Sequence, residues 1–566
     1  MRRGAVGPPL IHPENEPFMS SIDRRSFLHA TAVGVVASSA IPGFTRSQQP
    51  VAAVPTAPAP QRLSASFELE EVTLADLQSG FASGRWTSVQ VTQLYLDRIA
   101  TMDRQGPTLR SMLDLNPDAL AIAADADTMR RSGRFLGPLH GVPVIVKDNC
   151  DSHDKMTTTA GSLALEGSIA LHDSTVVARL RAAGAIVLGK SNLSEWANFR
   201  GDHSTSGWSS RGGAVRNPYV LDRNPCGSSS GTGASIAANF AAVGIGTETD
   251  GSIVCPSNNC GLVGVKPTIG MVSRAGIIPI SASQDTAGPM TRTVTDAAQL
   301  LAAIQGADGR DPSTPVARGA GLADTASYLK LDALKGARIG VVRQSLTGYD
   351  VNTDRVFNES LEVLKQLGAI IVDPANIPHI DDYGKDEGTV LHYEFKAGVN
   401  AYLAALGPNA RMKTLEDLIR FNSDNKDRVM PWYGQEDFLK SQACGPLTDK
   451  KYIDARAKCV RLSRREGMDK VMAQHQLDVL VAPTGGPAWT TDLLNGDHFG
   501  GSSSTPCAVA GYPHVTVPMG WLHELPIGLS FMGLPWTEAK LLGYAFSYEQ
   551  ATKQRRAPKF LATLEG

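Results

Sequence analysis

The chain has 566 residues, of which 42% are apolar and 19% are charged, a balance typical of soluble globular proteins. This length allows one large core or two to three ordinary domains. The formal net charge is −2, so no overall basic field exists to attract nucleic acid or an anionic membrane. The 55 glycines favour a fold with many tight turns, which suits an α/β enzyme better than a helical bundle.

The first 40 residues have the pattern of a twin-arginine export signal. Arg24-Arg25-Ser26-Phe27-Leu28 precedes a mildly apolar run over residues 30–40, which predicts export to the periplasm or the medium. The run is too short for a stable membrane-spanning helix, so we expect no stable membrane association of the mature protein. Met19 is an alternative start that would give the signal a more usual length. Residues 41–66 are rich in Pro, Ala, Ser and Gln and predict a flexible linker.

From Phe67 onward, the apolar residues recur with the periods of helices and strands. Helices are predicted over residues 74–81, 91–99, 175–183 and 228–242, with Thr87 or Ser88 capping the second, and strands over 142–146, 185–188, 337–342, 369–372 and 477–482. Strands that alternate with helices indicate an α/β architecture. Residues 375–460 are more polar and predict a helical insertion that shapes a substrate cleft.

The seven cysteines contain no CxxC pair, which argues against a zinc site or a thioredoxin-like redox motif. Proteins exported by the twin-arginine route fold in the reducing cytoplasm, so we expect mostly free, buried cysteines. The chain also lacks a Rossmann glycine fingerprint and a metal-ligand cluster. We therefore expect no cofactor and no metal.

Three segments carry the residues that could perform chemistry. In residues 137–149, Lys147 ends a β-branched run, near the strand edge where open α/β sheets bind ligands. In residues 224–234, Ser228 lies in a Gly/Ser run that opens a helix, where free backbone N–H groups can face a developing oxyanion. In residues 246–256, Ser252 follows Asp-Gly, where a tight turn can expose its hydroxyl.

Each segment alone has an ordinary structural explanation. A lysine at a strand end often extends its amine to solvent. A Gly/Ser run is often a capped helix or a flexible loop, and a serine after Asp-Gly is often a simple turn residue. Only the combination of the three segments is specific.

In this order, the three segments resemble those of the amidase signature family, and the resemblance covers nearly all of residues 67–555. Residues 158–162, 189–198, 261–268, 285–290 and 481–484 match the family pattern too. The resemblance implies a single large α/β domain, over residues 67–560, with a mixed sheet flanked by helices. It also implies that Ser252 is the nucleophile, Ser228 the bridging serine and Lys147 the base.

The sequence departs from the commonest family pattern in two places. Cys226-Gly-Ser-Ser-Ser230 stands in place of Gly-Gly-Ser-Ser-Gly, and Asp250-Gly251 stands in place of Gly-Gly before the nucleophile. Both departures resemble the peptide amidase branch, as does Ser252-Ile-Val-Cys-Pro256. The serines stay in place, so the departures bear on substrate specificity and not on the triad.

These residue types suit amide hydrolysis. An amide is a poor electrophile, so Ser252 must lose its proton as it attacks. Lys147 can accept that proton only when burial has lowered its pKa enough to make it neutral, and Ser228 can relay the proton between them. The only histidine in these segments, His140, is interpreted as structural.

The backbone N–H groups of Thr249, Asp250, Gly251 and Ser252 are the predicted oxyanion hole, which typically contributes ~3 kcal/mol per donor. Water would then hydrolyse the acyl-enzyme on Ser252. Thr159, Gly227 and Ser229 are predicted to contact the substrate.

The leading hypothesis is hydrolysis of carboxamides, such as C-terminal amides of peptides, to a carboxylate and ammonia. A broader aryl- or acylamidase that cleaves secondary amides is an alternative. The glutaminase subunit of an amidotransferase is another, although export would separate it from its tRNA and ATP-dependent partner. The expected partner is thus a small amide or peptide amide, and the oligomeric state stays open.

Overall fold

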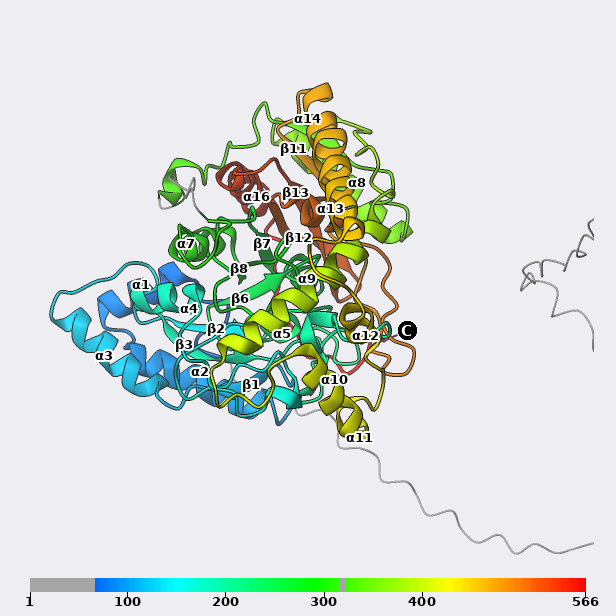
Figure 1. The fold of residues 1–566 in the computed structure, drawn as a ribbon. Coiled ribbons are helices and arrows are strands. Elements are labelled where there is room, and N and C mark those ends of the chain that lie inside the picture. The colour runs from blue at the N-terminus through cyan, green and yellow to red at the C-terminus, as the bar shows by residue number, and fades with distance from the viewer. Residues whose placement is uncertain (1–66, 315–321, 323, 566) are drawn as a thin grey trace, which may run out of the picture. The chain divides into compact units, whose positions relative to one another are not determined.

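The computed structural model describes residues 67–314, 322 and 324–565 (Figure 1). The predicted export signal (1–40) and linker (41–66) lie outside the described residues. The described residues belong to one compact unit. None of their helices is both long and apolar enough to span a membrane.

A mixed sheet of eleven strands forms the centre of this unit and confirms the expected α/β architecture. In spatial order its strands are β1 (Met112–Leu115), β3 (Ile186–Ser191), β2 (Pro143–Lys147), β6 (Val243–Glu248), β8 (Thr286–Thr291), β7 (Val263–Lys266), β12 (His514–Leu522), β13 (Leu525–Met532), β11 (Val479–Pro483), β9 (Arg338–Val341) and β10 (Ile370–Val372). Strand β2 runs parallel to both β3 and β6. A separate hairpin pairs β4 (Trp208–Ser209) with β5 (Gly213–Ala214).

Helices flank the sheet. They are α1 (Leu74–Ser83), α2 (Ser88–Met102), α3 (Ala119–Arg131), α4 (Thr175–Ala182), α5 (Ser230–Ala237), α6 (Val254–Asn259), α7 (Val294–Ile304), α8 (Val351–Gln366), α15 (Thr505–Ala510) and α16 (Glu538–Thr552). Thr87 begins α2 with a capping box in which its side chain and that of Gln90 each accept the other's backbone N–H.

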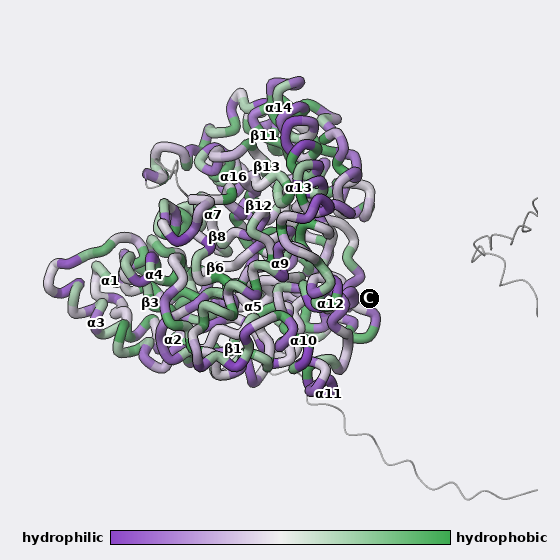
Figure 2. The backbone as a smooth tube through the Cα atoms, in the orientation of Figure 1, coloured by the Kyte–Doolittle hydropathy of each residue, from purple (hydrophilic) through white to green (hydrophobic). Residues whose placement is uncertain are grey.

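Residues 384–475 form a run of helices that pack mainly on one another. They are α9 (Gly384–Ala405), α10 (Leu415–Asp424), α11 (Lys426–Val429), α12 (Glu436–Gln442), α13 (Lys450–Ser463) and α14 (Asp469–His475). Helix α9 crosses in front of the central strands in Figure 1. Much of α13 is coloured hydrophilic in Figure 2, as expected for a helix with one face in water.

A buried arginine, Arg200, connects part of this helical run to the rest of the unit. The Arg200 guanidinium donates to Glu195 at 2.5 Å, and both side chains are fully buried. The same guanidinium also donates to the backbone carbonyls of Val429 and Tyr433. Separating the helical run from this segment would break the hydrogen bonds from the charged guanidinium to these two carbonyls, each of which typically contributes about 1.5–3 kcal/mol.

Several predicted element boundaries differ from the observed ones, and two of them bear on the segments that carry polar residues. The helix expected over residues 228–242 spans only Ser230–Ala237, so Ser228 lies in the loop before it. The strand expected to end before Gly189 continues to Ser191, because the neighbouring strands extend its ladder.

The central strands β6, β7, β8, β12 and β13 were not predicted from the sequence. Glycine interrupts the β-branched residues of β6, and the interior of β8 reads Ala-Gly-Pro-Met in place of a β-branched run. Gly244 shows why: a Cβ atom there would lie 2.7 Å from the Thr232 methyl group. Small residues in β6 therefore let α5 pack closely on the sheet.

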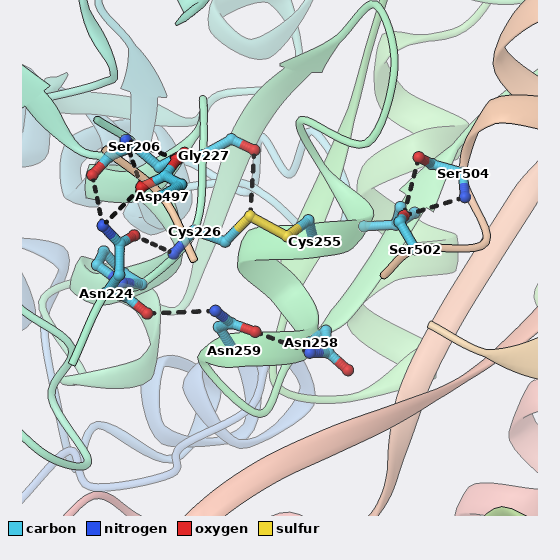
Figure 3. The surroundings of a disulfide bond; sticks show 12 residues. Ser206, Asn224, Cys226, Gly227, Cys255, Asn258, Asn259, Asp497, Ser502 and Ser504 are labelled. Carbon is cyan, nitrogen blue, oxygen red and sulfur yellow. Dashed lines mark hydrogen bonds between the residues drawn. A yellow bond between two sulfur atoms is a disulfide. The ribbon is translucent and has the colours of Figure 1, made fainter. Parts of the chain in front are cut away.

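A disulfide joins Cys226 to Cys255 across the loop that carries Ser228 and the start of α6 (Figure 3). The cysteine pair packs with Trp489, and the Cys226 backbone N–H donates to the Asn224 side chain at 2.8 Å. Among the described residues the other five cysteines are free, and all of these except Cys444 are buried, as expected. The disulfide itself was not predicted, although its cysteines flank Ser228 and Ser252 in sequence.

The disulfide closes a loop with a sequence separation of 29 residues. The loop-closure entropy predicts ~3–4 kcal/mol of stabilisation. Replacing both cysteines (Cys226→Ser with Cys255→Ser) should therefore lower the melting temperature by roughly 3 °C for a chain of this size. Differential scanning calorimetry measures this shift, and the half-buried Cys444→Ser is the control that should leave it unchanged. An unchanged melting temperature in the double variant would contradict the prediction.

Candidate active site

The parallel strands β2 and β6 bring the first and third segments together. Val146 of β2 pairs with Ile245 of β6, so both strands reach the same edge of the sheet. Lys147 ends β2, and Thr247 and Glu248 end β6. Residues 100 positions apart are thus held side by side by the sheet.

Lys147 is fully buried, and its amine contacts only neutral groups. Its Nζ lies 2.7 Å from the Ser228 hydroxyl, 2.9 Å from the Thr247 hydroxyl and 3.2 Å from the Thr247 carbonyl. Among the described residues no carboxylate forms a salt bridge with it. Burial lowers the pKa of Lys147 from 10.5 to about 7, although the nearby charges of Asp285 and Glu248 act in the opposite direction.

The loop before α5 carries Ser228, which is 1% exposed. The Gly227–Ser228 peptide bond is cis. The next residue, Ser229, is fully buried and ties this loop to the third segment: its backbone N–H donates to the Ser252 carbonyl, and its hydroxyl donates to the Thr247 carbonyl. Its donors are therefore engaged within the protein.

Ser252 follows a turn that requires glycine. Gly251 has φ = 78°, in the left-handed region that residues with a Cβ rarely adopt. Ser252 is 8% exposed, and its hydroxyl makes no hydrogen bond with any other described residue. The Glu248 carboxylate accepts the backbone N–H groups of Ile253 and Val254 at 2.7 and 3.0 Å, which anchors the chain directly after the turn.

The turn presents a set of unused backbone donors. Within the described part of the chain, no protein acceptor takes the backbone N–H of Thr249, Asp250, Gly251 or Ser252. The side chain of Thr249 donates to Asp285 at 2.6 Å, just before the strand next to β6. Free N–H groups converging beside an available hydroxyl are the arrangement that an oxyanion hole needs.

The other residues predicted to contact the substrate are Thr159 and Gly227, and both lie in packed surroundings. The Thr159 hydroxyl donates to the Asp148 carboxylate, next to Lys147, and is fully buried. A Cβ atom on Gly227 would lie 2.2 Å from the Ser194 hydroxyl, so this position has room only for glycine. His140 is buried away from the triad, with Nε2 3.0 Å from the Ala126 carbonyl.

Three residues that hold the site together were not predicted from the sequence: Thr247, Glu248 and Asp285. Thr247 provides two of the contacts of the Lys147 amine and also accepts from the Asn149 side chain. All three residues lie inside stretches that match the family pattern. Their polar side chains at strand ends were a signal that could have identified them.

The helical run borders a pocket of about 390 Å³. Glu394, Gly398 and Tyr402 of α9 line one wall, and Arg274 and Asp285 line another. The pocket approaches the turn through Asp285, which holds Thr249. The helical run thus adjoins the turn that carries the nucleophile candidate.

Comparison with known proteins agrees with this geometry. The family model described as Amidase matches residues 90–542. The solved structure of native peptide amidase from Stenotrophomonas maltophilia has a TM-score of 0.84 and 49% sequence identity to this chain, over 87% of this chain and 99% of that one. A curated "Probable amidase" of Arabidopsis thaliana is 40% identical over 511 residues, 88% of this chain and 94% of the relative.

A more distant relative is one component of a glutamyl-tRNA(Gln) amidotransferase. This protein, from Chloroflexus aurantiacus, is 34% identical over 510 residues, 86% of this chain and 98% of the relative. The match to the family model, the buried lysine–serine pair and the identity to both kinds of relative lead to one conclusion: the chain belongs to the amidase family and is a hydrolase that acts on amides.

Proposed function

We propose that this protein hydrolyses the C-terminal carboxamide of peptides, giving the free peptide acid and ammonia, with Ser252 as nucleophile, Ser228 as proton relay and Lys147 as base. The observation that carries the proposal is the 2.7 Å contact between the Lys147 amine and the Ser228 hydroxyl in a fully buried setting. The identity of 49% with a peptide amidase supports the choice of substrate.

The contacts of Lys147 are consistent with a neutral amine. An ammonium has three donors and no lone pair, whereas a neutral amine has two donors and one acceptor position. The two oxygens of Thr247 can take the two N–H groups of the neutral form. Its lone pair then accepts the Ser228 hydroxyl proton, which makes Ser228 ready to accept a proton in turn.

In the acylation step, the Ser252 oxygen attacks the carboxamide carbon while its proton passes to Ser228 and the Ser228 proton passes to Lys147. The oxyanion forms beside the free N–H groups of residues 249–252. When the tetrahedral intermediate collapses, the C–N bond breaks and the relayed proton returns to the leaving nitrogen, so ammonia departs. Water then attacks the ester on Ser252 by the same relay and releases the acid.

One prediction from this function concerns the substrate. The protein should release ammonia from amidated di- and tripeptides faster than it cleaves aryl amides or fatty amides, and Ser252→Ala should lower every rate by at least about a thousandfold. Ammonia release and product mass measure this. The thermal melting of Ser252→Ala should match that of the parent, because one hydroxyl in a turn contributes little to stability.

Other outcomes separate the alternatives. Faster cleavage of aryl amides would identify a broader acylamidase. Glutamine hydrolysis without peptide amide hydrolysis would favour an amidotransferase-type activity. Unchanged turnover by Ser252→Ala would contradict the assignment of the nucleophile.

Another prediction concerns Lys147 and the pH dependence of the rate. Because its pKa is lowered to about 7, the neutral, active form is lost as the pH falls through this value. The kcat should therefore rise as the pH rises through about 7. Lys147→Arg should be as inactive as Lys147→Ala, since a guanidinium stays charged and cannot accept the proton. Substantial turnover by Lys147→Arg in a pH-resolved assay would assign the proton transfer to another residue.

We also propose that residues 1–40 direct export through the twin-arginine pathway. The support is the arrangement of Arg24-Arg25 before the apolar run at residues 30–40. A fusion of residues 19–45 to a reporter should be exported, and the Arg24→Lys, Arg25→Lys fusion should stay in the cytoplasm. Fractionation of cells that carry each fusion measures this. Export of the lysine variant would point to the general secretory route.

A further inference from the structure

Two carboxyl groups meet beside the turn that precedes Ser252. One belongs to Asp250, which replaces the glycine of the commonest family pattern, and the other belongs to Glu387 on α9. The Asp250 oxygens accept the hydroxyl groups of Ser504 and Thr505, the latter at 2.7 Å. Glu387 is 8% exposed and Asp250 is half-buried, so this contact is partly shielded from water.

A second connection joins Glu387 to the same turn. The Gln284 side-chain amide lies 2.8 Å from the Glu387 carboxyl and 3.4 Å from the Thr249 carbonyl. Glu387 is therefore linked to Asp250 through its carboxyl group and to Thr249 through Gln284. Both of these turn residues offer free backbone N–H groups to the site.

Two ionised carboxylates in contact repel each other strongly when water only partly shields them, so the pair retains one proton. Asp250 accepts two hydroxyl donors, which stabilise its anion, whereas Glu387 accepts only from Gln284. The proton thus belongs on Glu387, which donates it to Asp250. Burial and the adjacent Asp250 charge raise the pKa of Glu387 well above its usual range.

None of the other ionisable groups that face the pair offsets its negative charge as this proton does. They are Tyr383 before α9, Cys459 on α13, Cys507 on α15, Glu248 on β6 and Lys266 on β7. Lys266 is the one cation among them, and its amine donates to the Tyr512 carbonyl at 2.8 Å and faces Glu248. The contact between the two carboxyl groups therefore depends on the proton that they share.

We propose that Glu387 is a positioning residue for the hydrolysis: its protonated carboxyl group donates to Asp250 and holds residues 249–252 in the shape that receives the oxyanion. This inference rests on the function proposed above. In this role Glu387 does not need to contact the substrate. Helix α9, which carries Glu387, thus takes a direct part in the geometry of the turn.

The arrangement has a consequence at alkaline pH. When the pair loses its proton, two negative charges repel each other next to the turn, and the donors of the turn lose their alignment. The kcat should then fall at high pH, while the rise that depends on Lys147 remains at lower pH. The KM should change little, because the effect acts on the oxyanion and not on substrate binding.

Three variants test this. Glu387→Gln keeps a donor for Asp250 but cannot ionise, so its kcat at neutral pH should stay within about threefold of the parent and the alkaline fall should disappear. Glu387→Ala removes the donor and should lower kcat at least about tenfold with a similar KM. Asp386→Asn, on the same turn of α9, removes the Lys458 salt bridge only and is the matched control.

The measurement is the pH profile of kcat and KM on any amide that the protein hydrolyses in a Ser252-dependent manner, so it does not depend on the peptide amide assignment. Melting temperatures identify variants that fail to fold, and Glu387→Gln alone remains decisive if Glu387→Ala unfolds. An alkaline fall that persists in Glu387→Gln, or no alkaline fall in the parent, would overturn the proposal. Hydrolysis that does not require Ser252 would instead overturn the proposed function.

Discussion

The contact between the Lys147 amine and the Ser228 hydroxyl depends on a sheet that buries a lysine and, among the described residues, gives it no salt bridge. Removing an ammonium from water costs several kcal/mol unless a counter-charge is present. The protein avoids this cost by favouring the neutral amine, whose donors the two Thr247 oxygens can take. Three features exclude water from this lysine: the neighbouring parallel strands, the close packing of α5 and the loop that carries Ser228.

Two other fully buried lysines show how specific this setting is. Lys190 donates to the Cys150 carbonyl and the Thr158 hydroxyl, and it lies close to the carboxylate of Asp148. Lys266 donates to the Tyr512 carbonyl and faces Glu248. Neither of these lysines contacts a serine hydroxyl, whereas the Lys147 amine lies 2.7 Å from that of Ser228. The chemical difference between the lysines lies in their neighbours and not in their burial.

The sequence predicted the architecture and the three polar segments, because period-2 and period-3.6 patterns and the family resemblance are both local properties of the chain. It missed β8, where packing against neighbours and not β-branched composition determines the strand. It also missed Glu387, which is one of many acidic residues in a polar helical region until the fold brings it to Asp250. Contacts between segments that are far apart in sequence carry no local signature.

The separation of β2 from β6 along the chain has a consequence for the cell that makes this protein. Every protein around a newly made chain is itself a polymer of amides. In an incompletely folded chain, Lys147 is exposed to water and regains the pKa of an ordinary lysine, so it carries a proton at neutral pH. The base that activates the serine therefore comes into being only when the sheet has closed, and an unfinished chain is chemically harmless to its surroundings.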